Sequence, residues 1–327
     1  MRWLGILLLL LLTLAVSAAN IGAMKLSLPM LWHAGTDSSL WQIWFTIRLP
    51  RVLLAVIVGG ALALSGCVMQ GLFRNPLADP GLLGISSGAA LAVAFSIVLS
   101  ITLPGVLALY VPLLAAFAGS IAVTLLIFLL SRQGFSGLSR LLLVGIAVNA
   151  LCGAAVGVLS WVSTDQQLRQ LSLWGMGSLG SAQWTTVLVC ASVVVPTMVL
   201  VQRLAGRLNL LQLGEEEAHY LGVDVLRTQR YLLVLSALLV AAAVSVSGII
   251  GFIGLVVPHL MRFCLGGDHR WLLPSSLLSG AILLLLSDTL ARTLVAPAEM
   301  PVGLLTSLIG GPWFLWLILR RRGGMNG

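Results

Sequence analysis

The sequence predicts an all-α membrane protein that forms one transmembrane domain, residues 1–327, with about ten transmembrane helices. Hydrophobic residues make up 59% of the chain and charged residues only 9%, a ratio that cannot supply the polar coat of a soluble globular protein. A membrane-spanning helix needs roughly 20 apolar residues. Apolar runs separated by glycine, proline or charge predict spans at 3–19, 52–72, 82–103, 110–131, 141–163, 184–202, 231–248, 249–265, 272–291 and 302–319.

The first span is a leucine-rich run that directly follows Met1 and Arg2. A basic start, an apolar stretch and small residues at 15–19 are also typical of a cleaved secretion signal. We expect the helix to be retained, because an even number of spans with arginine-bearing termini on one side requires it.

Glycines mark the boundary between two predicted spans and a packing surface on a third span. Between spans 231–248 and 249–265 the chain carries no charge, and Gly248, Gly251 and Gly254 alone indicate a turn. Span 141–163 has a stripe of small residues, at intervals of four, where another helix can approach closely. Its amide, Asn149, seeks a partner or a wet cavity in the membrane, which makes it a candidate pore-facing residue.

Basic residues predict the orientation, since Lys and Arg near span ends favour the cytoplasm. With the N-terminus inside, thirteen of the eighteen basic residues lie inside and five outside, namely Lys25, Arg48, Arg51, Arg169 and Arg292. The sequence therefore predicts an inner-membrane, multi-pass protein with both termini in the cytoplasm. Topology and anionic lipid explain the net charge of +8 without a nucleic-acid partner.

The motifs of two functional classes are missing from the sequence. The four histidines are scattered and no H-E-x-x-H occurs, which argues against a metal-dependent enzyme. An ion-coupled transporter commonly carries carboxylates deep in the membrane. Asp288 is the one acidic residue inside a predicted span, and its position four residues before Arg292 predicts that the two side chains pair. A nucleotide-binding P-loop needs a lysine after glycine, yet Lys25, the only lysine, precedes leucine. An ATP-driven version of this protein must therefore take its ATPase from another polypeptide.

Residues 203–230 form the one long polar segment of the chain. Gly214 can end one element, three glutamates then favour a helix start, and Gly222 stops the short helix. A short amphipathic helix on the cytoplasmic face suits a soluble partner. A solvated loop, or a helix lying on lipid, is the alternative.

The chain closely resembles the permease subunits of bacterial ABC importers for iron chelates, haem and cobalamin, the FecCD or BtuC-like family. The resemblance rests on residues 44–51, 59–70, 73–86, 139–145, 168–171, 214–222, 251–259 and 297–303. It implies a type II importer permease with ten helices, which pairs with a second copy of itself, two cytoplasmic ATPase subunits that hold ATP and magnesium, and a periplasmic binding protein. No cofactor or metal is expected in this chain. An echo between Leu64-Ser65-Gly66 and Val246-Ser247-Gly248 independently suggests that spans two to five repeat, inverted, as seven to ten.

The resemblance also implies roles for residues at matching positions. The residues expected to dock to the binding protein are Arg48, Arg51 and Arg292. The alternative for Arg48 and Arg51 is anchoring to lipid, and the alternative for Arg292 is pairing with Asp288. Contact with the ATPase falls to Gly214, Glu215, Glu216, Ala218, Leu221 and Gly222. The cytoplasmic gate falls to Asn75, Leu77, Leu138 and Ser139, although leucine at 138 is more apolar than the hydroxyl residue expected there. The candidate pore residues are Asn149, Met69, Met176 and Arg169, with core packing as the alternative for the methionines and headgroup binding for Arg169.

The segment 168–180 and the C-terminal part of the chain look most like haem permeases. Haem is therefore the expected substrate, followed by a ferric siderophore and then cobalamin. An ion-coupled secondary transporter is the alternative from another class.

Overall fold

The computed structural model describes residues 2–22, 38–101, 104–131, 137–295 and 298–322. Lys25 and Arg132, which contribute to the predicted charge asymmetry, lie outside these ranges, and the side chains of Arg320, Arg321 and Arg322 are also not described.

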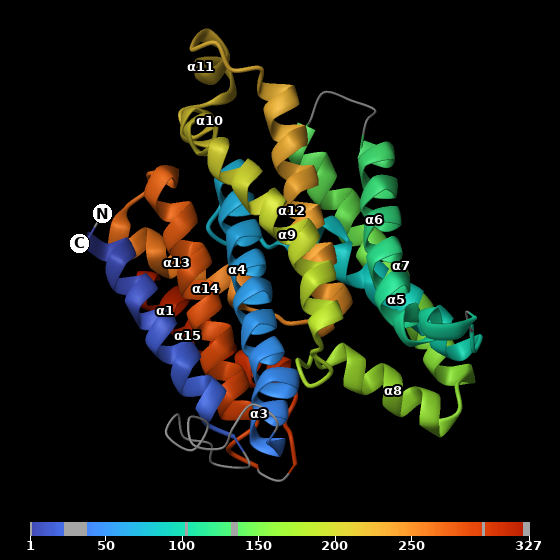
Figure 1. The fold of residues 1–327 in the computed structure, drawn as a ribbon. Helices are drawn as coiled ribbons and strands as arrows, with labels where there is room; N and C mark the ends of the chain where they lie inside the picture. Colours follow the sequence, from blue (N-terminus) through green and yellow to red (C-terminus); the bar gives the residue numbers. More distant parts are fainter. Residues whose placement is uncertain (1, 23–37, 102–103, 132–136, 296–297, 323–327) are drawn as a thin grey trace.

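Every regular element in the described ranges is a helix (Figure 1). Seven helices are long and apolar enough to cross a membrane, and α5, α13 and residues 302–315 of α15 are shorter apolar helices. The ten are α1 (Arg2–Asn20), α4 (Leu49–Leu72), α5 (Ile85–Val98), α6 (Val111–Ser131), α7 (Gly137–Val162), α9 (Trp184–Arg203), α12 (Val225–Ser247), α13 (Ile253–Leu265), α14 (His269–Ala291) and α15 (Val302–Arg322).

The remaining helices are short and lie between the apolar ones. They are α3 (Ser39–Ile43), which continues through the π-helical η1 (Trp44–Arg48) into α4, the 3₁₀ turns η2 (Pro80–Leu83) and η3 (Gly105–Tyr110), and α8 (Asp165–Gly175), α10 (Ala205–Leu211) and α11 (Glu215–Tyr220). The α8 helix has a full capping box, in which Thr164 and Gln167 exchange side-chain to backbone bonds.

Two helices differ from the predicted spans because of local backbone geometry. The third span was expected at 82–103, but α5 begins at Ile85, since Pro80 opens a 3₁₀ turn and Gly84 adopts a left-handed φ of 73°. The eighth was expected from 249, but α13 begins at Ile253. Gly248 with a φ of 69° ends α12, and Phe252 with a φ of 67° precedes α13.

Helix α4 forms the centre of the bundle and packs against α12, α13 and α14 (Figure 1). Nearly all its residues from Pro50 to Leu72 are buried. Two glycine contacts set its spacing, because a Cβ atom on Gly59 would collide with the backbone of Gly280, and one on Gly66 with the backbone of Gly254. Small residues therefore let α4 approach α14 and α13 at backbone distance.

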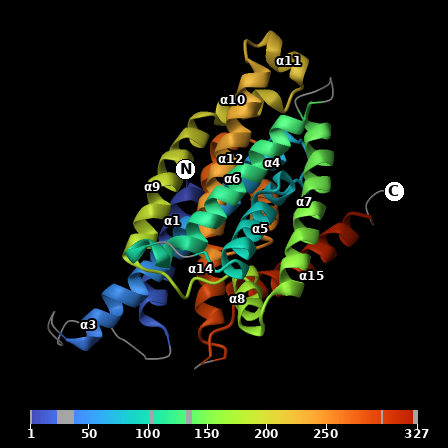
Figure 2. The same ribbon diagram turned by 90° about the vertical axis from the view of Figure 1, so that its right-hand side faces the viewer.

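The bundle has two distinct ends. Helices α10 and α11 project from one end, and α3 and α8 lie toward the other (Figures 1 and 2). The last residues of α1 contact Arg48 at the α3 end, and Gly303 at the start of α15 donates to Gly177 just after α8. The first residue of α1 and the last of α15 therefore both point toward the α11 end.

Candidate functional sites

The segment 214–222 forms a short helix that projects from the bundle. Gly214 has a φ of 138°, and a Cβ atom there would collide with the carboxylate of Glu217. The three glutamates occupy the first turn of α11, where the helix dipole favours negative charge. Gly222, with a φ of 84°, follows the helix.

The exposed side chains of this helix include apolar ones. Leu213, Tyr220 and Leu221 are 61%, 86% and 57% exposed, and Glu215 and Glu216 are exposed beside them. We call these five residues the α11 surface. Apolar groups left in water at a projecting tip are typical of a protein contact site. Leu213 and Tyr220 were not predicted, although both adjoin the predicted segment.

Buried and hydrogen-bonded groups join the α11 surface to the rest of the bundle. Ala218 was predicted as a contact residue, but it has no exposed surface, so it packs the helix onto its base. Gln212 donates to the carbonyl of Gly71 at the end of α4. Asn209 donates to Asp268 at 2.6 Å and accepts from the backbone N–H of His269 at 2.8 Å, at the start of α14. These hydrogen bonds join α10, the helix that precedes α11, to α4 and α14.

Three arginines meet at the opposite end, at the close of α1. Arg48 donates to the carbonyls of Ala19 and Asn20 at 3.2 and 2.7 Å, and Arg292 donates to that of Ala18. These carbonyls belong to the last turn of α1, which leaves acceptors without helical partners. The arginines thus cap α1 with side chains from the start of α4 and the end of α14.

Arg51 joins the same group through two carboxylates. Its Nε and Nη2 hold Asp288 at 3.0 to 3.1 Å, while its Nη1 holds Glu299 at 2.9 and 3.0 Å. Arg292 lies 3.8 Å from Asp288, so the predicted pair exists, but Arg51 is the closer partner. We call Arg48, Arg51, Arg292, Asp288 and Glu299 the arginine cluster.

Burial of the arginine cluster bears on its predicted role. Arg48, Arg51 and Arg292 are 6%, 7% and 7% exposed, and Asp288 is 1% exposed, whereas the Glu299 side chain is 52% exposed. In this structure the guanidinium groups are directed to internal acceptors rather than to the surface. Glu299 is the member that a partner can reach, and it was not among the predicted docking residues.

The predicted gate residues lie in two separate places. Asn75 and Leu77 are exposed after α4, where the Asn75 side chain accepts from the Leu77 N–H at 2.9 Å. Leu138 and Ser139 lie in the first turn of α7, half-buried and exposed respectively. Within the described chain, no hydrogen bond or ion pair joins one pair to the other.

The predicted pore residues occupy four different environments. Met69 has no exposed surface inside the bundle, so it is a core side chain here and not a pore lining. Met176 caps α8 and is 37% exposed, and Arg169 is exposed on the same helix.

Asn149 alone of these residues combines fixed hydrogen bonds with a cavity. It donates to the carbonyl of Gly81 at 3.1 Å and accepts from the hydroxyl of Ser87. It also lines a cavity of about 370 Å³ with Ser86 and Gly153. The amide therefore has both the partner and the open space that were predicted as alternatives.

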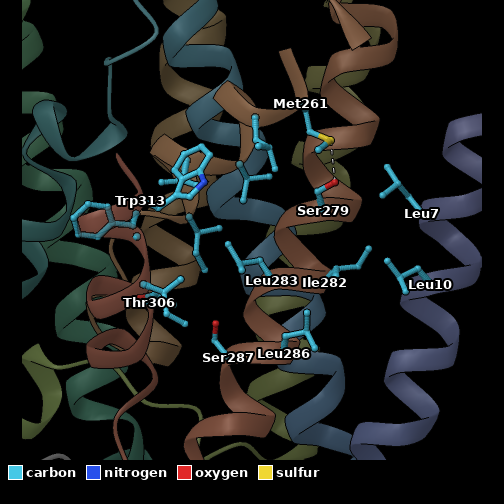
Figure 3. A pocket seen from close by; sticks show the side chains of 17 residues that line it. Leu7, Leu10, Met261, Ser279, Ile282, Leu283, Leu286, Ser287, Thr306 and Trp313 are labelled. Carbon is cyan, nitrogen blue, oxygen red and sulfur yellow. Dashed lines mark hydrogen bonds between the residues drawn. The ribbon is translucent and has the colours of Figure 1, made fainter. Parts of the chain in front are cut away.

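A second cavity, of about 330 Å³, lies between α1, α13, α14 and α15 (Figure 3). Its walls are aliphatic and aromatic, with Leu7, Ile282 and Trp313 among them, and its few polar groups include the hydroxyl of Ser279, which donates to Met261 at 3.1 Å. No predicted pore residue lines it. Among the described residues, no group of three or more His, Cys, Asp or Glu is placed to hold a metal ion.

The chain is similar to known transport proteins in both sequence and structure. The model of the FecCD transport family matches residues 7–320. The chain is 65% identical to the hemin transport system permease protein HmuU of Yersinia pestis over 324 residues, which cover 99% of this chain and 97% of that protein. It is 45% identical to the cobalamin import system permease protein BtuC of Halobacterium salinarum, covering 84% and 73% of the two chains. A solved metal-chelate type ABC transporter in an inward-facing conformation superposes with a TM-score of 0.88 at 38% identity, covering 98% of this chain and 99% of that one.

Proposed function

Because the chain belongs to the FecCD transport family and is a permease subunit of an ABC importer, we propose that it moves haem from the periplasm to the cytoplasm by alternating access. The observation that carries haem as the substrate is the 65% identity, over nearly the full length of both chains, with a permease named for hemin transport. Relatives named for cobalamin are 45% identical or less, which makes cobalamin and ferric siderophores the competing substrates.

The proposal places a cytoplasmic ATPase on the α11 surface. Three features support it, namely the projection of α11 from the bundle, its exposed leucines and tyrosine beside two glutamates, and its anchoring to α4 and α14. Two ATPase copies, one per permease chain, would hold ATP and magnesium. The permease itself would contribute no group to hydrolysis.

An ATPase bound at the α11 surface would imply one orientation of the permease in the inner membrane. The α11 end would lie in the cytoplasm together with both chain termini, and the arginine cluster would lie at the periplasmic end. The excess of arginine toward the α11 end supports this orientation through the preference of basic residues for the cytoplasmic side.

A second copy of the chain would complete the translocation path. Helix α7 supports this proposal, because Gly153 and Gly157 have open space around them and Leu151 and Trp161 are 69% and 86% exposed. The predicted gate would then form between copies, which agrees with the separation of its two halves within one chain. Asn149 would face this path, and small apolar linings would let a bulky ligand pass without being held.

A periplasmic binding protein would dock at the arginine cluster. Since Arg51 is shielded and bonded to Glu299, a partner carboxylate would reach it only by taking the place of Glu299. Charge-assisted bonds between arginine and carboxylate would give this docking its defined geometry.

The decisive experiment is ATP-dependent uptake into proteoliposomes that contain this permease with its ATPase. Haemin, a ferric siderophore and cobalamin are each supplied with a matching binding protein, and a non-hydrolysable nucleotide serves as the control. We expect uptake of haemin only. Robust siderophore or cobalamin uptake without haemin uptake would overturn the substrate, and uptake driven by an ion gradient without ATP would overturn the ATP-driven mechanism.

A further inference from the structure

A small cavity of about 190 Å³ lies at the α11 end of the bundle. The last turn of α4, the last turn of α13 and the segment after α10 surround it. Its polar lining comprises Gln70, Arg74, Gln212, His259 and Arg262. No role proposed above uses this cavity.

Arg262 presents an incomplete hydrogen-bonding edge in this cavity. Its Nε and Nη2 atoms are buried and have no acceptor among the described residues. These are the same two atoms with which Arg51 holds the carboxylate of Asp288. The Nε–Nη2 edge is suited to binding two oxygens of one carboxylate or phosphate. Two buried N–H groups without an acceptor are destabilising, so this edge of the half-buried Arg262 side chain calls for an oxyanion.

Arg74 adds a second positive charge to the lining of the cavity, and its backbone has an uncommon conformation. It follows the end of α4 with a φ of 48°, a left-handed conformation that glycine adopts more readily. None of the described acidic residues lines the cavity. Two arginines in one cavity without a carboxylate repel each other, and an anion between them would offset this repulsion.

The helix ends alone do not explain this arrangement. A cation in the last turn of α13 interacts favourably with the helix dipole, but that interaction is available to an arginine whose head lies in water. It does not require the Nε–Nη2 edge to be buried. Gln70 adds a further buried group, since its Nε2 donates to the carbonyl of Leu255 at 2.9 Å while its Oε1 has no donor among the described residues.

We propose that this cavity binds a phosphate group, held by the Nε–Nη2 edge of Arg262 and the charge of Arg74. Gln70 Oε1 would accept from the protonated oxygen of a free hydrogen phosphate, or from a glycerol hydroxyl of phosphatidylglycerol, whose phosphodiester carries no proton. The phosphate belongs either to a free anion or to the headgroup of an anionic phospholipid. Bound there, it links α4 and α13 at the base of the α11 surface, beside Gln212.

The test uses the full-length protein and the variants Arg262→Gln and Arg74→Gln. In the first arm, the thermal midpoint in detergent is followed against sodium phosphate, with sodium chloride at matched ionic strength. In the second arm, native mass spectrometry measures retention of phosphatidylglycerol after exchange from nanodiscs, with phosphatidylcholine as the comparison lipid. Arg207→Gln is the matched control, because Arg207 is an exposed arginine on α10 at the same end.

We expect phosphate or phosphatidylglycerol to bind the unmodified protein and the Arg207→Gln control. Binding should weaken at least tenfold in Arg262→Gln and at least threefold in Arg74→Gln. A response to inorganic phosphate identifies a free anion, and selective retention of phosphatidylglycerol identifies a lipid. If neither probe binds, or if both cavity variants bind as well as the control, the proposal is overturned. Should Arg262→Gln fail to fold, the exposed Arg74 decides the outcome.

Discussion

Asp288 is predicted to stabilise the α3 end of the bundle far more than Glu299 does, although both carboxylates bind Arg51. Asp288 is 1% exposed and lies between two buried arginines, while the Glu299 side chain is 52% exposed. Replacement of Asp288 by asparagine leaves three arginines with one carboxylate in the cluster. Breaking a buried ion pair by removing one partner costs about 3 to 5 kcal/mol.

Glu299→Gln provides the matched control, because it removes one negative charge from the same arginine. An exposed ion pair contributes about 0 to 1 kcal/mol, so we expect Asp288→Asn to lower the free energy of unfolding by several times more than Glu299→Gln. Unfolding in mixed micelles, followed by circular dichroism against denaturing detergent, measures both losses.

Replacing Arg51 by methionine in the Asp288→Asn protein should recover part of the loss, since the uncompensated charge is removed with its partner. Equal losses for the two single variants would refute the argument that burial decides the strength of these pairs. So would a loss below about 1 kcal/mol for Asp288→Asn, because that is the range of an exposed pair.

Two further predictions concern helix packing and the α11 surface. Gly66→Ala should prevent stable folding or lower the thermal midpoint strongly, because the added Cβ meets the backbone of Gly254. The control Gly5→Ala, with open space around it, should be neutral or slightly stabilising. Similar midpoints for both variants would contradict the close approach of α4 and α13. Joint charge reversal, Glu215→Lys with Glu216→Lys, should abolish co-purification of the ATPase while membrane insertion persists, and reversal of the exposed Asp165 at the opposite end should not; a normal ATPase yield in the double variant would exclude the α11 surface as its binding site.

The sequence alone could predict most of the helices, because each apolar run of membrane-spanning length must satisfy its backbone bonds internally. It could also predict α11, since Gly214, the glutamates and Gly222 act locally. It could not place the start of α5, where Gly84 and the turn before it shorten the helix. Nor did it indicate α8, which lies within a polar segment between two predicted spans.

The arginine cluster shows why side-chain roles were harder to predict than helices. Arg51 and Asp288 are 237 residues apart, so neither periodicity nor spacing connects them. The sequence brings Asp288 and Arg292 together on one helix, which is correct, but the nearer partner arrives through the packing of α14 on α4. Likewise, the burial of Met69 follows from the packing of α12, α13 and α14 around α4 and not from its neighbours in the chain.

The anchoring of α10 gives a way to separate ATPase binding from transmission of its movement. Asn209 and Gln212 lie below the α11 surface and join it to α14 and α4. A hydrogen bond to a charged group contributes about 1.5 to 3 kcal/mol and a neutral one about 0.5 to 1.5 kcal/mol. The double variant Asn209→Ala with Gln212→Ala removes one bond to a charged group and two neutral ones, which together contribute about 2.5 to 6 kcal/mol, and it leaves the exposed contact residues intact.

We expect this variant to retain its ATPase and to hydrolyse ATP, while the amount of substrate moved per ATP falls at least fivefold. Gln202→Ala, at the end of α9, is the control for loss of a glutamine at the same end of the bundle. The measurement is the ratio of uptake to phosphate release in the same proteoliposomes. If that ratio stays unchanged, the hydrogen bonds of α10 do not carry the movement, and the contact of α11 with α12, which includes the hydrogen bond from Gln229 to Glu215, becomes the path to test. If the ATPase is lost instead, anchoring and binding depend on the same residues, and α10 belongs to the contact site itself.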